Sequence, residues 1–121
     1  MKPYKTKLTV DIGYLANFSA PSRKAAPGAL RTLSRVRTDL TGASHALTHQ
    51  KASSASGRRG RTDVLSALRL ALTATSDART SATAARAGHS ASARAAAKRE
   101  QRQIGKAISK FQTGGRLLRL F

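Results

Sequence analysis

The stretch that decides the fold is Ser90 to Gln112, SASARAAAKREQRQIGKAISKFQ. On a helix, at about 100° per residue, cations that recur every four positions share one face. The cations of this face are Arg94, Lys98, Arg102, Lys106 and Lys110, with Arg99 beside them. The opposite side carries the small and apolar residues Ala93, Ala97, Ile104, Ala107, Ile108 and Phe111. The spacing predicts an amphipathic helix over residues 90–112 with one basic face.

Glu100 is the one acidic residue of this stretch and the one expected to offset its cations. Like charges at i, i+4 on a helix cost a few tenths of a kcal/mol per pair, about what opposite charges gain. A polyanion lying along the face would relieve that repulsion. We therefore expect the basic face to bind phosphate, and a solvated face of a small helical bundle is the alternative.

The overall charge favours the same partner. The chain of 121 residues has 23 Lys and Arg against 5 Asp and Glu, for a formal net charge of +18. Such a field attracts phosphate and opposes compaction, so we expect binding to the phosphate backbone of RNA or DNA. Leu, Ile, Val and Phe make only 22 of the residues. We thus expect one small domain with a thin, Ala-rich core, ordered only within an assembly that includes other protein subunits.

The N-terminal segment alternates in a different pattern. Between residues 4 and 14, Tyr, Thr, Leu, Val, Ile and Tyr alternate with mostly polar residues. This period of two, rich in β-branched residues, predicts a strand over residues 4–12. A single strand needs a partner outside its own chain, so the pattern also predicts pairing with another protein or a self-dimer through Tyr4–Ile12.

The expected fold is mainly α, with that strand followed by two or three amphipathic helices, basic loops and an extended C-terminal tail. Residues 1–27 would hold the strand and an irregular connection with Pro21 and Pro27. The first helix is expected over residues 28–50, where Leu33, Leu40 and Leu47 recur every seven residues. Arginines on its flank join the predicted nucleic-acid-binding set: Arg31, Arg35 and Arg37.

Residues 51–61, KASSASGRRGR, are small, polar and basic, which predicts a flexible loop. Its cations complete the predicted phosphate contacts: Lys51, Arg58, Arg59 and Arg61. Thr62 as an N-cap predicts a second helix over residues 62–87. Gly88 predicts a break before the basic helix. Two glycines, Gly114 and Gly115, are expected to end the basic helix and leave residues 113–121 as a cationic, apolar tail.

No enzyme is expected from this sequence. The acidic residues are Asp11, Asp39, Asp63, Asp77 and Glu100, and their scatter gives neither a carboxylate pair nor a nucleophile with an evident base. His45 and His49 have a spacing that can hold a metal, but the chain has no Cys and no carboxylate beside them. We therefore expect no metal and no cofactor.

The sequence also predicts a location and leaves two other functions open. No apolar run is long enough for a transmembrane span and the N-terminus does not resemble a signal peptide, so we expect the protein in the cytoplasm or in a nucleoprotein particle such as a ribosome or virion. The order strand, helix, helix also fits a dimeric ribbon-helix-helix-like DNA-binding regulator. A basic amphipathic protein on a membrane surface is the second alternative, weakened by an Ala-rich apolar face without Trp.

Overall fold

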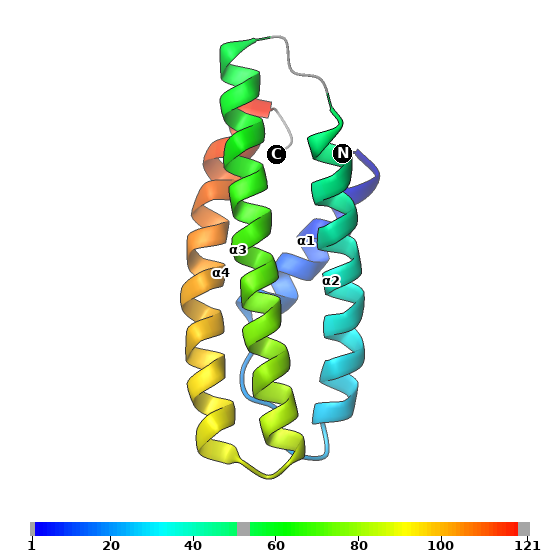
Figure 1. The fold of residues 1–121 in the computed structure, drawn as a ribbon, viewed down its shortest axis with the longest axis vertical. Coiled ribbons are helices and arrows are strands. Elements are labelled where there is room, and N and C mark those ends of the chain that lie inside the picture. Colours follow the sequence, from blue (N-terminus) through cyan, green and yellow to red (C-terminus); the bar gives the residue numbers. More distant parts are fainter. Residues whose placement is uncertain (1, 51–53, 119–121) are drawn as a thin grey trace.

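The computed structural model describes residues 2–50 and 54–118. Four helices occupy most of this part of the chain: α1 (Lys2–Ala16), α2 (Ala26–Thr48), α3 (Ala55–Arg86) and α4 (Ser90–Leu118). In Figure 1, α2, α3 and α4 run roughly alongside one another, with α3 in the middle, and α1 crosses obliquely behind α2 and α3. The prediction of a mainly α protein is confirmed.

The α3–α4 hairpin is built on small residues. The side chains that α3 buries include Ala67, Ala71, Ala74, Ala78 and Ala82. Those that α4 buries include Ala93, Ala96, Ala97 and Ala107. Alanine favours the helix and loses no side-chain entropy when it is buried, so two long helices can pack closely with few large side chains. The Ser81 hydroxyl adds a buried hydrogen bond of 2.7 Å to the Ala93 carbonyl across the interface.

Helix α3 ends in a turn at Gly88, where the sequence predicts a break before the basic helix. Gly88 has a φ of +83°, which places it in the left-handed region that glycine adopts without strain. The His89 N–H donates to the Ala84 carbonyl at 2.8 Å and the Gly88 N–H to the Ala85 carbonyl at 3.0 Å. These two bonds form a Schellman motif, which satisfies the last carbonyls of α3.

The heptad-spaced leucines of α2 form its buried side. Leu33, Leu40 and Leu47 are fully buried, as are Val36 and Ala43 between them. These five residues form the packing seam of α2, the side that contacts the other helices. The helix begins with Pro27 in its first turn, where the N–H that proline lacks would have no helical partner.

The predicted N-terminal strand is wrong, so the expectation of a self-dimer through Tyr4–Ile12, which rests on an unpaired strand, loses its basis. Residues 2–16 form α1, and the described residues contain no strand. The segment fits a helical period as well as a period of two, because Leu8, Asp11 and Leu15 lie on one side of the helix and are all buried. A helix satisfies its own backbone hydrogen bonds, which an unpaired strand cannot do.

The structure also moves the expected ends of α3 and α4. The expected basic loop is largely helix, because Ser54 caps α3 by accepting a hydrogen bond of 3.0 Å from the Gly57 N–H. Thr62 therefore lies inside the helix, where its hydroxyl donates to the Arg58 carbonyl. At the other end α4 continues through the two glycines to Leu118, so no extended tail begins at residue 113.

Gly114 lies at a close approach of the two helices of the hairpin. A Cβ atom there would be 2.8 Å from the Asp63 Cβ and 2.9 Å from the Gly60 carbonyl oxygen. The glycine therefore serves packing between the end of α4 and the start of α3, and the helix passes through it. The contact also shows that α3 and α4 are antiparallel.

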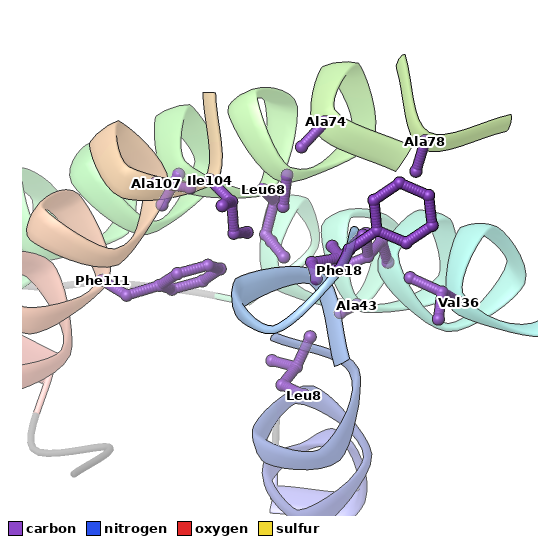
Figure 2. Packing of buried hydrophobic residues seen from close by; sticks show 14 of the residues in the cluster. Leu8, Phe18, Val36, Ala43, Leu68, Ala74, Ala78, Ile104, Ala107 and Phe111 are labelled. Carbon is purple, nitrogen blue, oxygen red and sulfur yellow. The ribbon is translucent and has the colours of Figure 1, made fainter. Parts of the chain in front are cut away.

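Larger side chains fill the core where α1 meets the other helices. Figure 2 shows Leu8 of α1 and Phe18, just after it, among residues of the other three helices. Those residues include Val36 of α2, Leu68 of α3 and the α4 residues Ile104 and Phe111. The expected Ala-rich core is therefore uneven, with alanine between α3 and α4 and bulkier residues beneath α1.

Candidate nucleic-acid interface

The basic face of α4 is exposed over its whole predicted length. The exposed cations are Arg94, Lys98, Arg99, Arg102, Lys106 and Lys110. The apolar residues predicted to lie opposite are buried, apart from the half-buried Ile108. At 1.5 Å per residue the cations from Arg94 to Lys110 extend over about 24 Å of the helix. At about 100° per residue each step of four residues turns about 40° past a full turn, so the exposed cations form a row that winds gradually around the outer side of α4.

Glu100 does not offset this row, contrary to the sequence-based expectation. Its side chain is fully buried on the opposite side of α4, and its Oε2 atom has no hydrogen-bond partner among the described residues. Burial raises the pKa of Glu100 to about 8; nearby Asp77 also raises it, while a hydrogen bond from Gln101 lowers it. The carboxyl is thus mainly protonated at pH 7. Helical spacing alone places Glu100 here, because it follows Ala97 by three residues and precedes Ile104 by four.

One cation of the row has an acidic neighbour. Arg99 Nε lies 3.7 Å from Asp77 Oδ1 of α3, so the two side chains form a salt bridge. The Arg99 side chain is 47% exposed, so the pair contributes at most about 1 kcal/mol to stability. Asp77 therefore offsets only Arg99, which lies beside the four-residue repeat, and in the described part of the chain the cations of the repeat itself have no salt bridge.

Gln101 joins the basic helix to the segment that ends α1. Its Nε2 atom donates to the Phe18 carbonyl at 2.7 Å, to the Glu100 Oε1 at 2.7 Å and more weakly to the Leu15 carbonyl at 3.4 Å. Phe18 lies two residues past the end of α1, and its carbonyl accepts the strong bond; the Leu15 carbonyl, in the last turn of α1, also accepts from the Phe18 N–H at 3.2 Å. The position of α1 against α4 thus depends on a polar contact beside the buried Glu100.

The predicted loop arginines lie in the first turns of α3. Arg58 and Arg59 are exposed, and half-buried Arg61 donates from Nη1 to the Gln50 carbonyl at 2.7 Å. Because the start of α3 packs on the end of α4, these arginines lie at the same end of the hairpin as Lys110. Lys51 lies outside the described residues.

The predicted arginines of α2 are exposed but belong to different surroundings. Arg31 is exposed on the helix, and Arg35 acts electrostatically on Asp11 of α1. Arg37 lines a groove toward α3, together with Arg79. Sequence reasoning missed Arg79; the signal for it is the helical spacing of Ser76, Arg79 and Thr83 along α3. The three arginines of α2 therefore do not join the α4 row in one surface.

A second buried carboxyl lies between α1 and α2. Asp11 is 1% exposed, and its Oδ2 atom has no hydrogen-bond partner among the described residues. Burial raises the pKa of Asp11 to about 7; a hydrogen bond and charge repulsion from Asp39 also raise it, while Arg35 and Lys7 lower it. The two carboxyls share their site most stably when one of them carries a proton.

The two histidines of α2 contact each other. The rings of His45 and His49 have centroids 4.3 Å apart, and His49 Nδ1 lies 2.9 Å from the His45 carbonyl oxygen. The described residues contain no group of three or more His, Cys, Asp or Glu side chains that could hold a metal. The ring nitrogen engaged with the backbone carbonyl gives this pair a local structural contact.

The membrane-surface alternative requires the apolar residues of α4 and of the C-terminal end of the chain to contact lipid. Ile104 and Phe111 are buried in the core, so they are not available to a lipid interface in this conformation. The side chains of Leu117, Leu118, Leu120 and Phe121 lie outside the described set. In the described part of the chain, none of the helices combines the length and apolar character that crossing a bilayer requires.

Comparisons with known proteins give no further information about this interface. No protein-family model, no curated protein and no solved structure matches the chain. The candidate interface is therefore the row of exposed cations on α4, with the arginines of α3 at one end, and it stands on the charge, burial and spacing of these residues.

Proposed function

We propose that this chain is a non-enzymatic, nucleic-acid-binding structural protein of a nucleoprotein assembly, and that the basic face of α4 neutralises phosphate. The observation that carries the proposal is the combination of an exposed cation row with the burial of Glu100, the only acid of α4. A solvated surface helix usually mixes charges of both signs, which stabilise one another at i, i+4. Here the helix holds its one acid on the inner side.

The length of the row fits a nucleic acid. Duplex DNA carries one phosphate per about 1.7 Å of its axis, so about 14 phosphates lie within the 24 Å from Arg94 to Lys110. Contacts from the six exposed cations would give a slope of about −5 in a plot of log affinity against log salt concentration. Backbone contact of this kind applies to RNA and DNA alike and carries no sequence information.

A triple charge reversal tests the role of α4. We expect Lys98→Glu, Arg102→Glu and Lys106→Glu together to weaken binding to a duplex about a hundredfold or more, because three charged hydrogen bonds are lost. The slope of log affinity against log salt should become shallower by about 3. Fluorescence anisotropy with a labelled duplex, measured over a series of salt concentrations, gives both quantities.

A matched variant separates the face from the net charge. Lys5→Glu, Arg23→Glu and Lys24→Glu change the charge by the same amount at exposed positions outside α4. If α4 is the main contact, this variant loses much less affinity than the α4 variant. Equal losses in both variants would show that net charge alone drives binding. Circular dichroism checks that both variants keep their helices.

Sedimentation tests the assembly. In a lysate of native cells we expect the protein to comigrate with a large particle and to be released by RNase or by DNase, whichever removes its nucleic acid. Recovery as a small free protein that responds to neither enzyme would contradict the structural role. Because a bound polyanion offsets the repulsion within a chain of net charge +18, we also expect nucleic acid to raise its melting temperature.

A further inference from the structure

A groove of about 850 Å³ lies between α2 and α3 and is separate from the α4 row. Arg37 and Thr41 line it from α2, and Ser76, Arg79 and Thr83 line it from α3. A cavity of about 430 Å³ shares both arginines and Thr41, and extends the groove along α2. In Figure 1, α3 lies between α2 and α4, so the groove and the α4 row belong to different sides of α3.

Helix α1 leaves this groove open. It packs on another side of α2, where Tyr4 contacts Gly42 and Asp11 contacts Asp39. At 100° per residue, Gly42 and Thr41 point in clearly different directions. The groove therefore lies on a side of the α2–α3 pair that α1 does not cover.

The lining of the groove is suited to an anion. Two guanidinium groups face it and no carboxylate lines it. Arginine binds phosphate through two parallel N–H donors, and neither Arg37 nor Arg79 takes part in a salt bridge within residues 2–50 and 54–118. The His89 side chain also lines the groove.

Hydroxyl groups in the groove divide into two sets. Those of Thr73, Thr75 and Thr80 donate to carbonyls of their own helix. Those of Thr41, Ser76 and Thr83 make no hydrogen bond to any described group, and so keep their donors for a ligand. Two arginines and three such hydroxyls along one groove match the repeated oxygens of a sugar-phosphate backbone.

The size of the groove favours one strand over two. Its volume falls within the range of small-molecule pockets, about 300–1,000 Å³, which suits a few nucleotides. A DNA duplex is wide enough to admit an α-helix into its own major groove, so it cannot enter a groove between two neighbouring helices. Leu72 supplies an apolar surface beside the arginines for the sugar.

We propose that the α2–α3 groove binds the backbone of a single-stranded nucleic acid, with Arg37 and Arg79 as its phosphate ligands. The proposal deepens the proposed function and rests on it. The cations of the α4 row contact the phosphate backbone of single-stranded or duplex nucleic acid on the protein surface. The groove, in contrast, admits only a single strand. The protein thus has a second contact surface that distinguishes single strands from duplexes.

The test compares two double variants on two probes. Arg37→Gln with Arg79→Gln removes the groove charges, and Arg23→Gln with Lys24→Gln removes the same charge from exposed positions between α1 and α2 that line neither cavity. The probes are a labelled oligo(dT) and a mixed-sequence duplex of equal length. We expect the groove variant to bind oligo(dT) at least about tenfold more weakly than the control variant. The salt slope for oligo(dT) should also become shallower by about 1.4.

The duplex distinguishes the failure of each claim. Both double variants should bind the duplex equally well. If the intact protein binds no nucleic acid, the proposed function fails. If the intact protein binds but the groove variant behaves like the control variant on oligo(dT), the groove proposal alone fails. Loss of duplex binding in parallel with oligo(dT) binding would also overturn it, because the groove would then act only through charge.

Amide chemical shifts provide a readout that does not depend on affinity. On titration with oligo(dT) we expect the largest changes at Ser76, Thr80 and Thr83 of α3. On titration with the duplex we expect them along the exposed side of α4. Changes confined to α4 with both probes would contradict binding in the groove. A melting curve for each variant confirms that the substituted proteins are folded.

Discussion

The α3–α4 hairpin and α1 are held in place by different means. The hairpin buries alanines along two long helices, ends α3 in a Schellman motif and brings Gly114 against α3. Helix α1 contains the β-branched residues Thr6, Thr9, Val10 and Ile12, which favour helix poorly, and it buries Asp11 with an unsatisfied oxygen. The hairpin is therefore stabilised both by the helix preference of its residues and by its packing. Helix α1 depends on its contacts with the other helices to remain helical.

The largest expected effect on the free energy of unfolding comes from replacing a buried leucine by alanine, which can be compared between the hairpin and α1. Leu68→Ala in α3 should lower the free energy of unfolding by about 2–5 kcal/mol and weaken the whole domain. Leu15→Ala removes a side chain that is equally buried in α1, but its cost is limited to the free energy that holds α1 in place. Native-state hydrogen exchange should therefore show fast exchange in α1 and preserved protection in α3. An equal loss of protection in α3 would show that α1 is an integral part of the core.

An intermediate effect is expected from the buried acid under α1. Glu100→Gln keeps the shape of the side chain and removes its charge, so at pH 9 it should stabilise the protein by about 1–2 kcal/mol. At pH 5 the carboxyl is already protonated and the variant should differ little from the parent. Melting temperatures at the two pH values test this, with Asp63→Asn of α3 as the control at a half-buried acid that does not act on Glu100. A variant that changes stability equally at both pH values would contradict a buried, protonated Glu100.

The parent protein should show the matching dependence on pH. Asp11 and Glu100 hold their protons more tightly in the folded state, with pKa values of about 7 and about 8 against about 4 for ordinary carboxyls. The folded state therefore binds more protons between these values, and stability falls as the pH rises from about 4 to about 8. Above that range these two groups add no further change.

The smallest expected effect lies in the turn of the hairpin. Gly88→Ala forces a side chain into the left-handed region and should cost about 1 kcal/mol, with no clash to add, because no atom lies within 4 Å of the new Cβ. Ala87→Gly is the control, because its residue has an ordinary right-handed conformation. Chemical denaturation measures both. A cost near zero for Gly88→Ala would mean that the turn adjusts its backbone.

The sequence predicts the secondary structure correctly where the apolar residues follow a single period, either that of a helix or that of a strand. The seam of α2 and the basic face of α4 are both visible from a 3.6-residue repeat with strong contrast between their sides. The segment of α1 satisfies two periods at once, and the choice between them is made by contacts of Leu8 and Leu15 with distant helices. The start of α3 was missed because Gly57 and Gly60 favour a loop, although Gly60 is buried where α4 approaches.

The candidate site divides in the same way. The exposed α4 cations follow from spacing alone, and so, in retrospect, does the inward position of Glu100. The groove does not, because Arg37 and Arg79 are 42 residues apart and come together only through the packing of α2 on α3. A pattern within one helix cannot report a surface shared by two.

The two tyrosines of the chain, Tyr4 and Tyr14, both belong to α1, and the chain has no tryptophan. Near-ultraviolet absorbance and intrinsic fluorescence therefore come chiefly from this one helix, while far-ultraviolet dichroism reports all four. The intrinsic chromophores of the protein therefore lie on α1, the helix that depends on the fewest contacts. A thermal melt can be followed by tyrosine fluorescence and by far-ultraviolet dichroism on the same unlabelled sample. If α1 detaches before the hairpin melts, the fluorescence curve has its midpoint at a lower temperature than the dichroism curve.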